Sequence, residues 1–82
     1  MGEGTQSIRA RIEQIVGDYL GARIAASAVR LAAITWAHHD PDDLKPEDMP
    51  AMRRGLEPML RTFLGTEVTA VVLKRVEEEV RA

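Results

Sequence analysis

The chain contains no cysteine and few aromatic residues. Among its 82 residues the aromatic side chains are only Tyr19, Trp36 and Phe63. The absence of cysteine excludes disulfides, thiolate metal sites and cysteine nucleophiles within the chain. Because aromatic residues are scarce, the core must be built mainly from Ala, Val, Ile, Leu and Met. Ala and Leu favour helices, and a small, alanine-rich core is often completed by oligomerisation.

Long apolar runs and net positive charge are lacking as well. No run approaches the roughly 20 residues that span a bilayer, since the longest candidate, residues 24–37, is interrupted by Arg30. The first residues have no apolar stretch of signal-peptide length, so a cytoplasmic protein is expected. The net charge of −2 gives no overall basic field for a polyanion. Nine arginines and eleven alanines favour a bacterial origin.

The first half of the chain predicts two helices. Residues 1–4 are expected to be a frayed tail, followed by a helix with Thr5 or Ser7 as its N-cap. Its apolar residues recur at helical spacing as far as Leu20, and Gly21 suits its C-terminus. Residues 22–38 are apolar nearly all round. This pattern predicts a central helix covered on most sides, with more apolar surface than one small chain can bury.

The second half predicts two more helices after a hinge. Methionines and leucines recur at helical spacing over residues 49–64, and the helix is expected to kink near Pro58, which cannot donate a backbone hydrogen bond. Residues 66–81 favour a fourth helix, although their valines leave a strand as the alternative. The sequence therefore predicts an all-α fold, a small four-helix bundle of two helical hairpins, in a single domain over residues 1–82.

The acidic, proline-rich hinge at residues 40–48 follows two adjacent histidines. His38, His39, Asp40 and Asp42 could supply nitrogen and oxygen ligands to a metal ion. Adjacent histidines point about 100° apart on a helix, however, and neither a calcium loop nor a spaced histidine pair is present. Acids at a helix start and histidines at a helix end favour the helix dipole. The preferred interpretation is a capped hinge with Asp40 and Asp48 as caps, and metal binding stays an alternative.

Enzyme motifs are not evident in the chain. There is no phosphate-binding glycine loop, Ser7 and Ser27 have no nucleophile context, and the chain leaves little room for an enclosed pocket. We expect no enzymatic activity, no catalytic residues and no cofactor.

The function that this pattern favours is protein–protein interaction, as a small adaptor or regulator that forms a homodimer. The residues expected to bind a partner are Met49, Met52, Arg53, Leu56, Met59, Leu60 and Phe63. The residues expected in the dimer interface are Ala25, Ala28, Val29, Ala32 and Trp36. DNA binding through Arg53, Arg54 and Arg61 is an alternative, although the acidic net charge and the long hinge argue against a helix-turn-helix.

Overall fold

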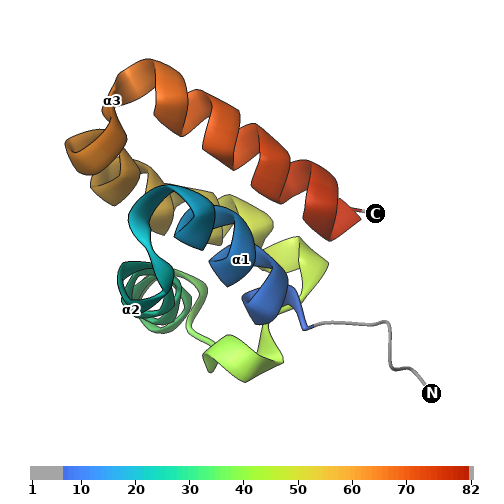
Figure 1. Cartoon of the computed structure of the whole chain (residues 1–82). Coiled ribbons are helices and arrows are strands. Elements are labelled where there is room, and N and C mark those ends of the chain that lie inside the picture. Colours follow the sequence, from blue (N-terminus) through green and yellow to red (C-terminus); the bar gives the residue numbers. More distant parts are fainter. Residues whose placement is uncertain (1–6, 82) are drawn as a thin grey trace.

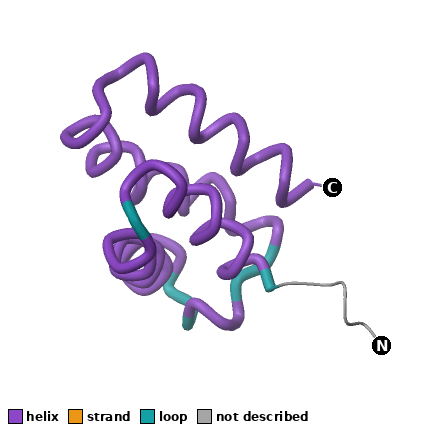
Figure 2. The backbone as a smooth tube through the Cα atoms, in the orientation of Figure 1, coloured by secondary structure: helices purple, strands orange, loops and turns teal. Residues whose placement is uncertain are grey.

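Helices are the only regular secondary structure in the part of the chain that the structure describes. The computed structural model describes residues 7–81, and the tail expected at residues 1–4 lies outside this range. The α-helices are α1 (Ile8–Leu20), α2 (Ala22–Ala32) and α3 (Met49–Arg81). Three short helical turns join α2 to α3: the π-helical η1 (Ala33–Ala37) and the 3₁₀ turns η2 (Pro41–Asp43) and η3 (Pro46–Asp48). No strand occurs over residues 7–81, so the all-α prediction is confirmed (Figures 1 and 2).

The predicted four-helix bundle is wrong in its helix count. Over residues 7–81 there are three α-helices, because the segments predicted as a third and a fourth helix are one element, α3. Gly65 inside α3 has φ 81° and ψ 169°, and the helix folds back there into a first arm, residues 49–64, and a second arm, residues 66–81 (Figure 1). Only glycine adopts this conformation readily. The sharp bend therefore lies at Gly65 and not near Pro58, which α3 accommodates with helical backbone angles.

The start and end of α1 follow local rules. Ser7 is the N-cap, and its Oγ accepts a hydrogen bond from the Ala10 N–H at 3.1 Å. The other predicted cap, Thr5, lies outside the described residues. Gly21 ends α1 with φ 91° and ψ 155°, and its N–H donates to the carbonyl of Gly17. Nearly the same backbone conformation therefore turns the chain at Gly21 and at Gly65.

Side chains from all three α-helices meet in one core. Polar contacts at its edge show that α1 and the second arm of α3 are antiparallel, since Arg11 Nη1 donates to the Glu79 carbonyl at 3.0 Å and Arg75 Nη1 donates to the Tyr19 hydroxyl at 3.1 Å. The largest fully buried side chains are Ile12, Val16, Val29, Met52, Leu56, Leu60, Thr69, Val72 and Val76.

The helix predicted over residues 22–38 is neither regular throughout nor central. It continues from α2 into the π-helical turn η1, and His38 ends it in the left-handed region with φ 58°. Only one narrow face of α2 is buried, and the rest is exposed. The prediction of a central helix is therefore wrong, because α1 and α3 cover α2 from one side only.

The close approach of α2 and η1 to α3 depends on Gly55. A Cβ atom built on Gly55 would lie 2.7 Å from Cδ1 of Trp36 and 2.8 Å from Cβ of Ala32, and such separations are too short for real contacts. The missing side chain at Gly55 and the small one at Ala32 let the two backbones approach closely. This contact fixes which face of α2 is buried.

Candidate functional site

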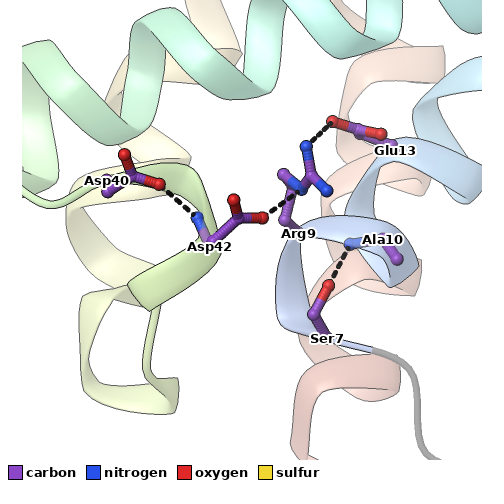
Figure 3. Close-up of polar contacts among 6 residues, drawn as sticks. All are labelled: Ser7, Arg9, Ala10, Glu13, Asp40 and Asp42. Carbon is purple, nitrogen blue, oxygen red and sulfur yellow. Dashed lines mark hydrogen bonds and ion pairs between the residues drawn. The ribbon is translucent and has the colours of Figure 1, made fainter.

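The acidic hinge is held by its own carboxylates and by α1. Oδ1 of Asp40 accepts a hydrogen bond from the Asp42 N–H at 2.9 Å and caps η2. Figure 3 shows Asp42 turned toward Arg9, whose Nε lies 3.0 Å from Oδ1 of Asp42. The same arginine lies 4.0 Å from Glu13 within α1. The predicted cap at Asp40 is confirmed, and Arg9 ties the hinge to the start of α1.

A second set of contacts stabilises the part of the hinge that directly precedes α3. Oδ2 of Asp48 lies 2.8 Å from Nδ1 of His39 and accepts a hydrogen bond from the Lys45 N–H at 2.9 Å. Asp48 thus turns back over η3 instead of capping α3 as predicted. Partial burial raises the pKa of the Asp48 carboxyl, but the hydrogen bonds from Lys45 and His39 outweigh it and lower the pKa below its usual value.

The four metal-ligand candidates serve different structural roles. His38 adopts the left-handed conformation that ends η1, and His39 faces Asp48. Asp40 caps η2, while Asp42 faces Arg9. Within the described range, no three side chains of His, Asp or Glu come close enough together to hold a metal ion.

The residues predicted to bind a partner are divided between core and surface. Met49, Met52, Leu56 and Leu60 lie in the core, and Met59 is partly buried against it. Arg53 is exposed, and its Nη1 donates to Oε2 of Glu77 on the second arm at 2.9 Å. Phe63 is 56% exposed. The methionine stripe therefore fills the core, and Phe63 is its large apolar neighbour on the surface.

The residues predicted for self-association are divided in a similar way. Ala25, Ala28, Val29 and Ala32 are buried in the core of the chain itself, where the three helices meet. Trp36 is 48% exposed, with its ring edge close to Gly55. The structure thus uses the small face of α2 for folding within one chain.

The large apolar residues of α2 remain exposed instead. Leu31 is 65% exposed and Ile34, in η1, is 50% exposed, while Ile24 also lies on the surface. Between α2 and the first arm of α3 lies a groove of about 320 Å³, which we call the α2 groove. It is lined by Arg23, Ile24, Ser27, Ala28, Leu31, Met59 and Phe63. The α2 groove gathers exposed apolar side chains from two helices, with Arg23 at its edge.

Sequence reasoning identified Met59, Phe63 and Ala28 but missed the large apolar residues Ile24 and Leu31 on the α2 side of this groove. The sequence did contain a signal for them, because small and large apolar side chains fall on different faces of this helix. Along residues 22–38, the alanines and Val29 lie on one face, while Ile24, Leu31 and Ile34 fall near another at spacings of seven and three. The close packing at Gly55 was also missed, although a glycine inside a helical pattern often marks a close contact.

Comparison of the chain with protein-family models, with curated proteins and with solved structures found no match. Over residues 7–81, none of the helices has the length and apolar character required to cross a membrane.

Proposed function

We propose that this chain is a small protein-interaction module that associates with itself through the α2 groove and the exposed apolar residues beside it. The observation that carries the proposal is the exposure of Leu31, which projects from α2 beside a groove shared with Met59 and Phe63. Fully burying a side chain such as Leu or Phe is favourable by about 1.5–3 kcal/mol. Contacts at this groove could therefore offset part of the entropy cost of association.

The arrangement of apolar residues supports the same proposal. Single exposed apolar side chains are common on protein surfaces, whereas exposed apolar residues gathered around one hollow are typical of interaction sites. Ile24, Leu31 and Phe63 are all exposed, and all three line the α2 groove. Their large apolar surface contrasts with the thin, alanine-rich side of α2 that is buried within the chain.

The other functions that the sequence left open have less support. Asp42 faces Arg9 and Asp48 faces His39, so a metal ion at the hinge would have to displace existing contacts. Arg53 lies 2.9 Å from Glu77, which partly neutralises one of the three arginines considered for DNA binding. The α2 groove, by contrast, would engage a partner without breaking an ion pair described over residues 7–81.

The mass of the chain in solution over a wide concentration range tests this proposal. Light scattering coupled to size exclusion should show a mass above 9.1 kDa that increases with concentration. The variant Leu31→Glu should remain at the monomer mass, because it places a charge in the apolar surface. Val71→Glu is the matched control, since Val71 is an exposed residue of the second arm and does not line the groove.

A wild-type chain that stays monomeric at millimolar concentration would contradict self-association. Equal effects of Leu31→Glu and Val71→Glu would show that the α2 groove is not the surface involved. Loss of association in Leu31→Glu alone, with unchanged helical circular dichroism, is the expected result.

A further inference from the structure

We draw no further inference here: the strongest candidate, the hollow of about 570 Å³ between η3 and the end of the second arm of α3, with Pro46, Met49 and Val80 in its apolar lining, is an unpartnered surface, and nothing in the described part of the chain shows what covers it.

Discussion

The two sides of α2 differ in side-chain size and in their surroundings. The buried side carries Ala25, Ala28, Val29 and Ala32, and it packs closely enough on α3 that Gly55 can carry no side chain. The other side carries Ile24 and Leu31, which contribute little to the core. Small residues serve the contact that requires close backbone approach, and large apolar residues are left exposed on the other side. The difference indicates that apolar composition alone does not show which face of a helix folds the domain.

The largest expected effect comes from placing a charge on the buried side of α2, and the same charge on its exposed side should have little effect. Val29→Asp should lower the free energy of unfolding by more than about 3 kcal/mol, because it buries an unpaired carboxylate. Leu31→Asp should change the monomer's free energy of unfolding by less than about 0.5 kcal/mol, since its side chain faces solvent. Urea unfolding followed by circular dichroism at low protein concentration measures both. Similar losses in the two variants would contradict the assignment of the two sides.

Alanine substitutions at Gly55 and at Gly17 should change the free energy of unfolding in opposite directions. Gly55→Ala should lower the free energy of unfolding by about 1–3 kcal/mol, because its Cβ would overlap Ala32 and Trp36. Gly17→Ala should raise it by up to about 1 kcal/mol, since alanine favours the helix and the new Cβ would lie 3.7 Å from Ala25 and from the Ala22 Cα. The same urea experiment compares them. A stabilised Gly55→Ala chain would show that α2 and α3 are farther apart than described.

A smaller change in the free energy of unfolding is expected from removing the buried hydroxyl of Thr69, in the core on which α2 packs. Thr69 is buried on the second arm, and its Oγ1 has no hydrogen-bond partner among the described residues. Thr69→Val keeps the shape and removes the unpaired group, so the free energy of unfolding should rise by about 1 kcal/mol. Thr62→Val is the comparison, because the Thr62 hydroxyl donates to the Pro58 carbonyl at 3.0 Å and is exposed. No gain at Thr69 would show that its hydroxyl is satisfied by water.

The smallest expected effect concerns Asp48, in the hinge between η1 and α3. Because its folded-state pKa is lowered, Asp48 stabilises the fold fully above the ordinary aspartate value of about 3.9. This contribution is lost as the pH falls through the lowered folded-state pKa. Asp48→Asn keeps an acceptor oxygen and should lower the free energy of unfolding by less than about 1 kcal/mol at neutral pH. Thermal melts from pH 7 to pH 2 should show this difference disappear in acid, and a constant difference would contradict the assigned role.

Local signals in the sequence predicted much of the helical structure correctly. Ser7 and Gly21 define the two ends of α1 because caps and left-handed glycines act within a few residues. Asp40 before Pro41 predicted the start of η2 for the same reason. Gly65 lies at the expected boundary between residues 49–64 and 66–81, and its backbone is non-helical there, although both arms belong to the single element α3.

Long-range packing could not be predicted in the same way. Residues 22–38 are apolar nearly all round, so periodicity could not show whether the face with Val29 packs within the chain or against a second copy. The stripe containing Met52 could equally fill a core or bind a partner, since methionine suits both. Which alternative holds depends on the direction in which α3 returns after Gly65. That direction places the second arm against α1 and leaves the outer side of α2 uncovered.

A dilution series followed by methyl NMR tests the central claim most directly, because it observes both sides of α2 in one sample. We expect the methyl signals of Ile24, Leu31 and Ile34 to shift as the chain is concentrated, while those of Val29 and Val72 in the core stay constant. Signals that are all independent of concentration, or shifts confined to Val71 and the second arm, would contradict the assignment of the α2 groove as the surface of self-association.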